Sequence, residues 1–508
     1  MKYVSKIGSL LLISAATLFL SLFAGEMMFR AIDGYELTSL DLVSTRPAPP
    51  PDPQYLARAA QYAKQIRLDP DFRIEWFDSN IQSILSVLFP PNREDRRLPD
   101  DWMRAVKQTT NRPYDEELRY TYNDNLVKEA CTSGSYPRPL NVFKDKPGFV
   151  YTFKSPDKTA DPAFRFVPHW SLISYVPNNF GFRGSDLAFS KPAGTIRVAF
   201  LGQSNTQDGW PNLVGLYLNK WARAVGLHAR FEIVNAGRAG IGIEGVARIM
   251  RYEVAPLRPD IVVAYVGATK LWRIEDVVSI PAAARRSVEQ SPFVAILANA
   301  DKYSALSNRL SQLIGSSRDV AEPAKPPHKL LFDLSAPVKL DQAGLPFRLN
   351  DEITELRYIE QTSRAIHAGL FLTSSIVLAH EGLRLDLPRD AGIYDQMMDE
   401  YWPLTYREIQ MAADFENRGY RALAGEDHLG FLEIAKYFPQ DPALFGDTIH
   451  LMSGGKSLQA WIVAQELAPV IREKVRKGEW PTPSTAAPHE IDWVKEIPKK
   501  FSFSGCKR

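Results

Sequence analysis

The sequence predicts an α/β fold in which a parallel sheet is covered by helices on both faces. Its strands are short apolar runs, its helices lie between these runs, and polar residues follow the strand ends. The predicted strands are residues 195–201, 231–234, 260–266 and 370–378. Helical stretches such as 211–225 and 245–254 separate them. Apolar runs that alternate with helices are typical of parallel strands buried on both faces, so we expect three layers.

Composition narrows the class of protein. The chain has 508 residues, of which 45% are hydrophobic, enough for a large core and roughly two to four structural units. Its net charge is +2, and no long basic run is interleaved with aromatic residues, so we expect no nucleic-acid partner. The two cysteines, Cys131 and Cys506, form no Cys-x-x-Cys pair and leave a disulfide and two free thiols equally open. Without metal-binding or phosphate-loop motifs, the sequence predicts no cofactor or metal.

The N-terminus predicts a membrane anchor over residues 1–30. Lys2 and Lys6 precede an uncharged apolar run over residues 7–24. At about 1.5 Å per residue, this run nearly crosses a hydrocarbon core of about 30 Å. The lysines favour a cytoplasmic N-terminus and an extracytoplasmic body, which is periplasmic in a bacterium. A cleaved signal peptide is the alternative, but the end of the run fits a cleavage site poorly.

The rest of the chain divides by composition and pattern. The predicted segments are a Pro-rich linker (31–54), an accessory region (55–167), the core domain in two parts (168–272 and 367–475), an insertion between them (273–366) and a tail (476–508). The insertion contains helical stretches at 281–289 and 304–314. Since it follows the third strand, it is placed to overhang the strand ends as a lid. Packing against the N-terminal region is the equally open alternative.

Three residue types in two distant motifs suggest nucleophilic chemistry. Ser204 directly follows an apolar strand, and Asp447 precedes His450 by three positions. A serine is a weak nucleophile until an imidazole takes its proton, and the imidazole needs a carboxylate to fix its tautomer. Ligands of parallel α/β sheets bind at the carboxyl ends of the strands, where Ser204 is expected to lie. The sequence therefore predicts a Ser-His-Asp site at this sheet edge.

These motifs occur in the order of four sequence blocks and together resemble the SGNH (GDSL-type) esterases and acyl hydrolases. Gly202-Gln203-Ser204 resembles the nucleophile block, with Gln203 where the family usually has aspartate. Its Gln-Ser-Asn form is similar to that of carbohydrate and sialate O-acetylesterases in the same superfamily. Residues 447–450 resemble the last block closely. The resemblance covers residues 178–272 and 369–468 and implies a flavodoxin-like parallel sheet.

The second and third blocks of this family supply oxyanion donors. Residues 235–240 resemble the second block, and Gly240 matches its donor glycine. Residues 267–270 stand where the third block has Gly-x-Asn-Asp, with Thr269 in place of the asparagine. The resemblance thus implies an oxyanion hole from the backbone N–H groups of Ser204 and Gly240. Whether the shorter Thr269 hydroxyl reaches as a third donor is open, and losing one donor can cost about 3 kcal/mol.

A competing motif overlaps the second block. Gly240, Gly242 and Gly245 follow a strand and open a helix, as in a dinucleotide-binding fingerprint. That fingerprint needs an acidic residue at the end of the next strand to hold the ribose. The next strand ends instead in Val266-Gly267-Ala268, so nucleotide binding is not expected.

Together, the motifs and the apolar N-terminus suggest a membrane-anchored, extracytoplasmic serine ester hydrolase or O-acyltransferase. The resemblance implies that Ser204 is the nucleophile, that His450 is the base and that Asp447 orients His450. The Gln-Ser-Asn variant and the exported setting suggest a small acyl group, such as acetyl, on an envelope carbohydrate. Hydrolysis and transfer stay open, because they differ only in what intercepts the acyl-enzyme. The alternative is a catalytically degenerate SGNH domain that serves as a binding or structural subunit of an envelope complex.

Overall fold

The structure is a computed structural model, and part of the chain is described. The described residues are 2–33, 35, 37, 53–80, 120–122, 151–154, 164–166, 169, 177–267, 277–279, 304–306, 309 and 319–483. Thr269, Cys131 and Cys506 lie outside them, so the predictions for these three residues stay predictions.

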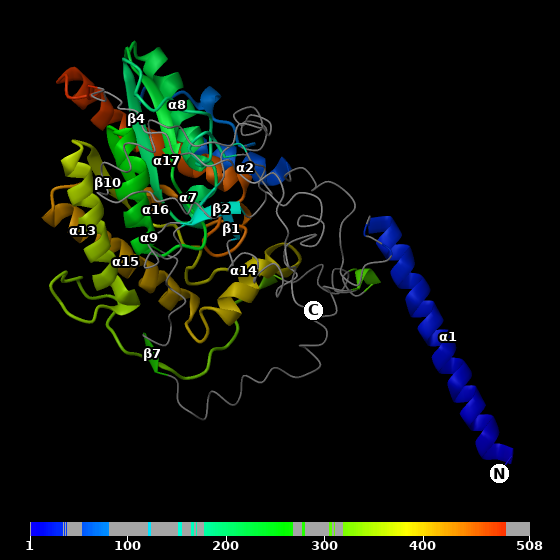
Figure 1. The fold of residues 1–508 in the computed structure, drawn as a ribbon. Coiled ribbons are helices and arrows are strands. Elements are labelled where there is room, and N and C mark those ends of the chain that lie inside the picture. The colour runs from blue at the N-terminus through cyan, green and yellow to red at the C-terminus, as the bar shows by residue number, and fades with distance from the viewer. Residues whose placement is uncertain are drawn as a thin grey trace.

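A five-stranded parallel sheet forms the centre of the fold (Figure 1). Its strands are β4 (Thr195–Gly202), β5 (Arg230–Asn235), β6 (Ile261–Tyr265), β10 (Gly369–Thr373) and β12 (Gly430–Leu432). They lie in the order β12-β10-β6-β4-β5, and all neighbouring strands run parallel. Counted along the chain, this is the 2-1-3-4-5 order of flavodoxin-like sheets. The predicted parallel sheet is confirmed.

The fourth strand along the chain is shorter than its apolar run. β10 ends at Thr373, whereas the sequence predicts a strand up to residue 378. Beyond Thr373, Ser374 N still donates to Leu432 O at 3.0 Å, and at Ser375 the side-chain Oγ donates to Val266 O over 2.6 Å. The chain therefore leaves the sheet while its residues remain buried.

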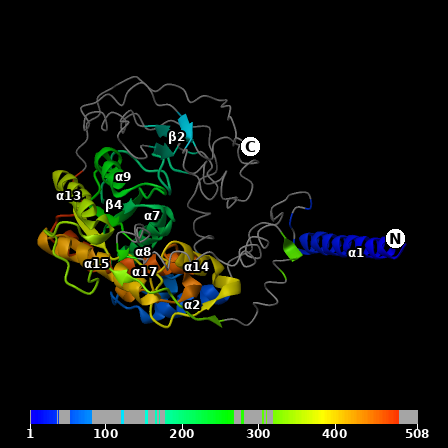
Figure 2. The same ribbon diagram turned by 90° about the horizontal axis from the view of Figure 1, so that it is seen from below.

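Helices cover both faces of the sheet, as the alternating pattern predicts. One face carries α8 (Trp210–Ala224) and α17 (Ser453–Arg476), which pack against each other. The other face carries α9 (Ile243–Arg248) with its π-helical continuation η3 (Ile249–Val254), α13 (Leu349–Ala365) and α15 (Tyr406–Glu426). Figures 1 and 2 show the sheet between these two groups of helices.

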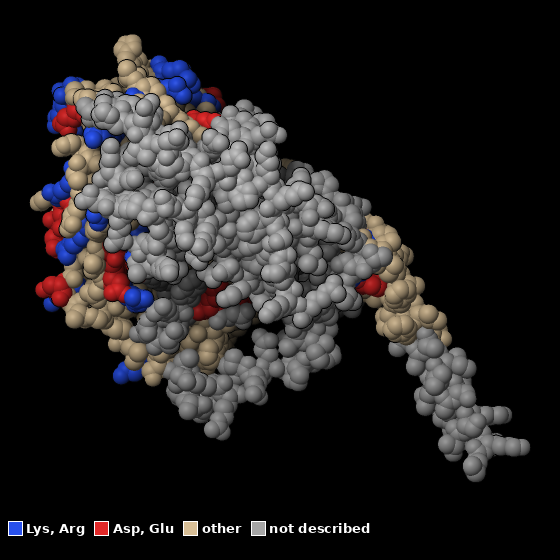
Figure 3. All heavy atoms as spheres, in the orientation of Figure 1, with Lys and Arg blue, Asp and Glu red and all other residues tan. Residues whose placement is uncertain are grey.

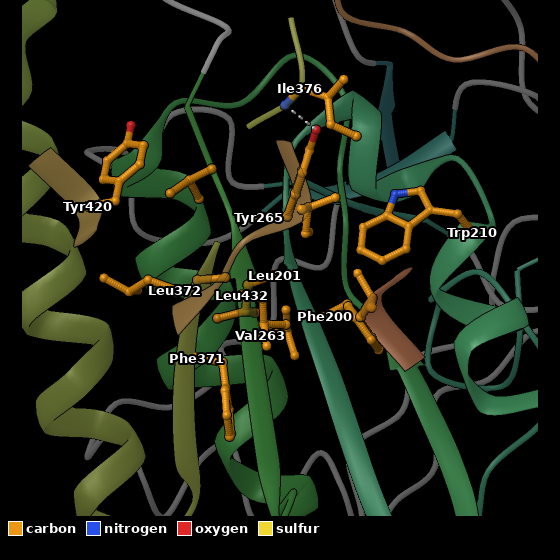
Figure 4. Packing of buried hydrophobic residues seen from close by; sticks show 14 of the residues in the cluster. Phe200, Leu201, Trp210, Val263, Tyr265, Phe371, Leu372, Ile376, Tyr420 and Leu432 are labelled. Atoms are coloured by element: carbon orange, nitrogen blue, oxygen red, sulfur yellow. Dashed lines mark hydrogen bonds between the residues drawn. The ribbon is translucent and has the colours of Figure 1, made fainter. Parts of the chain in front are cut away.

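Aromatic side chains pack the central strands β4 and β6 against α8. β4 and β6 are buried along their whole length. Phe200 packs edge-on against Trp210 with ring centroids 5.2 Å apart, and Trp210 packs edge-on against Tyr265 at 5.6 Å. The Tyr265 hydroxyl accepts a hydrogen bond from Ile376 N at 3.2 Å (Figure 4). These contacts fix the two strands whose carboxyl ends border the candidate site.

The N-terminal apolar run lies in helix α1 (Lys2–Asp33), which points away from the sheet (Figure 1). Among the described residues, no helix has both the length and the apolar character needed to cross a membrane. This finding does not support the transmembrane helix predicted over residues 7–24. The end of α1 contacts the predicted insertion, where Ala305 N donates to Glu26 Oε1 over 2.9 Å.

The predicted accessory region packs against α17 through residues 53–80, which include α2 (Pro53–Gln65). Gln465 Oε1, on α17, accepts a hydrogen bond from Leu68 N at 2.9 Å. Phe72 meets Trp461 edge-on, with ring centroids 5.4 Å apart. Farther along, β1 (Tyr120–Tyr122), β2 (Tyr151–Lys154) and β3 (Phe164–Phe166) form an antiparallel sheet. Residues 53–80 thus support the helix that begins just after His450.

The described part of the predicted insertion packs on the core domain. β8 (Asp319–Val320) pairs with β11 (Leu385–Asp386), and β7 (Val278–Ser279) pairs with β9 (Lys329–Leu330). His328 Nε2 lies 2.9 Å from Glu408 Oε2 at the start of α15. Helix α13 also falls within residues 273–366 and contacts β10 and α15. The helix predicted at 281–289, and most of that at 304–314, lies outside the described residues.

The first residues of the predicted tail close the amino-terminal edge of the sheet. The buried Asp260 carboxylate accepts hydrogen bonds from Thr482 N at 2.7 Å and from Lys191 Nζ at 2.6 Å. Both partners of the Lys191–Asp260 ion pair are buried. The chain therefore remains packed beyond the end of α17, up to Thr482.

Candidate active site

Ser204 lies where the sheet topology opens a crevice. It is the first residue of the short helix α7 (Ser204–Gln207), directly after β4. β4 has β5 on one side and β6 on the other, so the connections leave it at the switch point where ligands of such sheets bind. Gly202 makes the sharp turn possible, because a Cβ there would lie 2.3 Å from Tyr265 O. The predicted nucleophile is thus exposed to the carboxyl edge of the sheet.

The structure brings the three predicted residues together. His450 Nε2 lies 2.8 Å from Ser204 Oγ, although the two residues are 246 positions apart. His450 Nδ1 lies 2.6 Å from Asp447 Oδ2. Because a carboxylate only accepts, Nδ1 donates to Asp447 and leaves Nε2 free to accept from the serine hydroxyl. This is the arrangement of a Ser-His-Asp triad.

The Asp-x-x-His spacing has a local structural cause. Asp447 Oδ1 accepts hydrogen bonds from Ile449 N at 2.9 Å and from His450 N at 2.7 Å, which closes a tight side-chain turn. Gly446 N donates to His450 O at 2.8 Å and closes the loop from the other side. One carboxylate oxygen therefore shapes the loop while the other contacts the imidazole.

These contacts shift the pKa values of Asp447 and His450. Burial favours the neutral acid, but the hydrogen bonds from His450 and Ile449 outweigh it and lower the pKa of Asp447. For His450, burial favours the neutral imidazole, but the contact with Asp447 outweighs it and raises the pKa. Asp447 is thus ionised at neutral pH, and an imidazolium at His450 is stabilised by its neighbour.

The loop that carries Gly240 is tied to the nucleophile turn. Gln203 Nε2 donates to Ile241 O at 2.7 Å, and Ala239 N donates to Gln207 Oε1 at 2.6 Å. Gly240 has φ +74° and is exposed, as suits a turn glycine. The structure thus places the Gly240 turn beside α7, whereas Thr269 lies outside the described residues.

Sequence reasoning missed the structural contacts of three side chains near the site. Gln203, which replaces the aspartate usual in the family, joins the first and second blocks through its amide. Arg238 forms a buried ion pair with Glu253 at 2.7 Å, which ties residues 235–240, the second block, to η3. Arg183 donates to Gln207 O at 2.9 Å. No local pattern marks these contacts, since each depends on how distant segments meet.

Gly237 is expected to be indispensable for the packing of this loop. A Cβ at Gly237 would lie 2.2 Å from Gln207 N, a backbone atom that cannot move without shifting α7. We expect Gly237→Ala to lower the free energy of unfolding by about 1–3 kcal/mol, measured by chemical denaturation. Gly425→Ala, in helix α15 with open space around it, is the matched control and should be neutral or slightly stabilising. Equal stability of the two variants would contradict this account of the loop.

Four other histidines of the described residues have local structural settings. His169 contacts Asp186 at 2.8 Å, and His328 contacts Glu408. His367 and His428 follow helix ends with positive φ.

Within the described ranges, no group of three or more His, Cys, Asp or Glu side chains is arranged to hold a metal ion. On the face in Figure 3, basic and acidic side chains of the described residues are interspersed.

Comparisons with known proteins found matches among solved structures. No family model and no curated protein matches the sequence. Matching solved structures include an acetyl xylan esterase, 14% identical, that covers 54% of this chain and 100% of its own length with a TM-score of 0.30. A GDSL-like lipase from Bacteroides thetaiotaomicron is 11% identical and covers 54% of this chain and 88% of its own, with a TM-score of 0.29.

A third match is an acetyl xylan esterase from Geobacillus stearothermophilus. It is 14% identical and covers 55% of this chain and 97% of its own, with a TM-score of 0.31. Two of these three matches are thus described as acetyl xylan esterases and one as a GDSL-like lipase.

Proposed function

We propose that this protein is a serine ester hydrolase or O-acyltransferase that works through an acyl-enzyme on Ser204. One observation carries the proposal: the His450 imidazole contacts Ser204 Oγ at 2.8 Å through one nitrogen and Asp447 at 2.6 Å through the other. An imidazole held in this way can accept the serine proton and stabilise its own positive charge.

The first half of the proposed reaction forms the acyl-enzyme. Ser204 Oγ attacks the ester carbonyl carbon while His450 Nε2 accepts the hydroxyl proton. The carbonyl electron pair moves to its oxygen, where the backbone N–H groups of Ser204 and Gly240 stabilise it, with Thr269 as the proposed third donor. Collapse re-forms the carbonyl and breaks its bond to the alcohol oxygen, which takes the proton from His450.

The second half releases the acyl group by the same route. His450 accepts a proton from water or from an acceptor hydroxyl, whose oxygen attacks the acyl carbon. The bond to Ser204 Oγ then breaks, and Oγ recovers its proton from His450. Water gives hydrolysis and a sugar hydroxyl gives transfer, so one set of residues serves both reactions.

The pH dependence of the reaction is expected to respond to an ion pair beside the triad. Lys456 Nζ lies 2.8 Å from Asp208 Oδ2. After burial and Asp447, the next influences on the pKa of His450 are the Asp208 charge, which raises it, and the Lys456 charge, which lowers it. Since His450 must be neutral to accept a proton, kcat/KM falls as the pH drops through this pKa.

We therefore expect Asp208→Asn to move the acidic limb of the kcat/KM profile to lower pH and Lys456→Met to move it to higher pH. The profiles are measured on a soluble acetyl ester at constant ionic strength. The double variant is the control and should lie between the single variants. Shifts of both single variants in the same direction would show that this ion pair does not set the pKa of His450.

The proposed substrate is a small acyl ester, such as an acetyl group on an envelope carbohydrate. The support is the Gln203-Ser204-Asn205 form of the nucleophile block and the apolar run behind Lys2 and Lys6. The same run supports an anchored protein whose body lies outside the cytoplasm. A reporter that is active only in the cytoplasm, fused after Arg508, should give no signal. A signal there would overturn this location.

The second candidate function is a catalytically degenerate domain that binds an envelope partner. The observation that favours it is Thr269, which stands where the family has an asparagine donor. The two candidates differ in the reactivity of Ser204. An intact triad in a working site makes Ser204 a strong nucleophile, whereas a degenerate site leaves it an ordinary alcohol.

Labelling with a fluorophosphonate separates the two candidates. We expect the wild-type protein to be labelled on Ser204, as located by peptide mass spectrometry. Ser204→Ala should not be labelled, and His450→Ala should be labelled far more slowly. Turnover of acetyl, butyryl and octanoyl esters, with and without an oligosaccharide acceptor, then reports acyl size and transfer. A folded wild-type protein that resists the label and turns over none of these esters would favour the binding function.

A further inference from the structure

The loop between Asp447 and His450 is held by a side chain from outside the sheet. Gln396 lies on α14 (Leu387–Asp399), the helix that follows β11. Its Oε1 accepts two hydrogen bonds from Thr448, one from the backbone N at 2.8 Å and one from Oγ1 at 2.5 Å. Gln396 thus accepts both hydrogen bonds from Thr448, the residue that directly follows Asp447.

Thr448 is fully buried, and its polar atoms are all engaged. Because the amide oxygen of Gln396 only accepts, Thr448 Oγ1 donates its proton to it. Tyr401 OH lies 3.0 Å from the same hydroxyl and must therefore be the donor in that contact. On the other side, Thr448 O accepts from Leu378 N at 2.8 Å. These contacts give the Thr448 side chain and its flanking peptides one orientation.

That orientation matters because the Asp447 turn alone leaves the loop free to move as a unit. Asp447 Oδ1 binds Ile449 N and His450 N, so it shapes the loop internally but does not fix it to the protein. The contacts of Thr448 fix the loop to the protein, and Gln396 supplies those that join it to α14. A misplacement of about 1 Å in such a constellation can cost about 100-fold in rate.

We propose that Gln396 is a positioning residue of this site, acting through Thr448 on Asp447 and His450. The inference rests on the proposed function and deepens it. It also gives the described insertion a role, because β8 pairs with β11 and so anchors the start of α14.

The test compares Gln396→Ala with Gln440→Ala. Gln440 accepts from Ala379 N at 3.2 Å, one residue from Leu378, and does not contact Thr448. We expect Gln396→Ala to lower kcat about 10- to 100-fold with little change in KM, whereas Gln440→Ala retains kcat. Gln396→Glu keeps an acceptor oxygen and should recover part of the loss. If Gln396→Ala does not fold, Thr448→Val replaces it, because it removes the Oγ1 bonds to Gln396 and Tyr401 while the backbone N still donates to Gln396.

A second readout is independent of turnover. The proton between His450 Nδ1 and Asp447 is expected at low field in proton NMR, identified by its loss in His450→Ala. Gln396→Ala should shift or broaden this signal, and Gln440→Ala should not. Wild-type kcat or an unchanged signal in folded Gln396→Ala would overturn the positioning role. If the wild-type protein has no ester turnover, the proposed function fails separately, and the signal alone decides the role of Gln396.

Discussion

Ser204→Ala is expected to abolish ester turnover, with kcat reduced by about a million-fold, as for nucleophile removal in a serine hydrolase. The reason is that no other hydroxyl is bonded to His450 Nε2 among the described residues. Stability should change by about 1 kcal/mol at most, because only one partly exposed hydrogen bond is lost. Turnover is followed with a soluble acetyl ester, and the fold is checked by circular dichroism.

Ser335→Ala is the matched control for this experiment. Ser335 lies in an exposed turn, where its Oγ donates to Asp333, so the loss of its hydroxyl should leave turnover unchanged. Equal background rates for the wild-type protein and Ser204→Ala, across several acyl lengths, would contradict the esterase proposal. The non-catalytic binding function would then be the better account of the same fold.

Asp447→Asn is expected to reduce kcat by about 10,000-fold while the protein stays folded. An asparagine amide facing His450 Nδ1 would donate to that nitrogen and favour the tautomer with its proton on Nε2. Nε2 could then no longer accept the Ser204 proton. Since Asp447 raises the pKa of His450, the residual activity should also have its acidic limb at lower pH.

Asp441→Asn serves as the control for this second variant. Asp441 lies in the preceding segment and binds Arg58 at 3.0 Å, away from the imidazole. Its replacement should leave kcat near the wild-type value. If Asp447→Asn kept most of the activity, His450 would be oriented by other contacts, and the assigned role of Asp447 would be wrong.

Local sequence pattern predicted the central strands and the meeting of Ser204 with His450. β6 is apolar over its whole length and β4 is apolar apart from Thr195 and Arg197, so the burial of both strands could be predicted from their composition. β12 was not predicted, because it has three residues and begins with glycine. Gly430 is required there since a Cβ would lie 2.2 Å from the Phe371 ring, a contact with a strand far away in the sequence.

The same limit applies to the site. Ser204 and Asp447-x-x-His450 are recognisable because their chemistry depends on short spacings. Gln396 has no such mark: it stands 52 positions before Thr448 and is one polar residue among many on α14. Its contact with Thr448 depends on where α14 lies in the fold. The hydrophobic periodicity of the sequence does not predict that position. Positioning residues are therefore found from the fold, and reacting residues from the motif.

The packing of residues 53–80 on α17 also has a consequence for how the chain folds. Leu68 N bonds to Gln465 across 397 positions, and Thr482 reaches Asp260 across 222. Contacts between residues so far apart in the sequence form late in folding, because closing a long loop costs conformational entropy. His450 lies between the last strand and α17, the helix that these contacts hold. The triad should therefore assemble only after the residues up to about Thr482 have been synthesised, so a shorter, partly folded chain would lack an assembled triad.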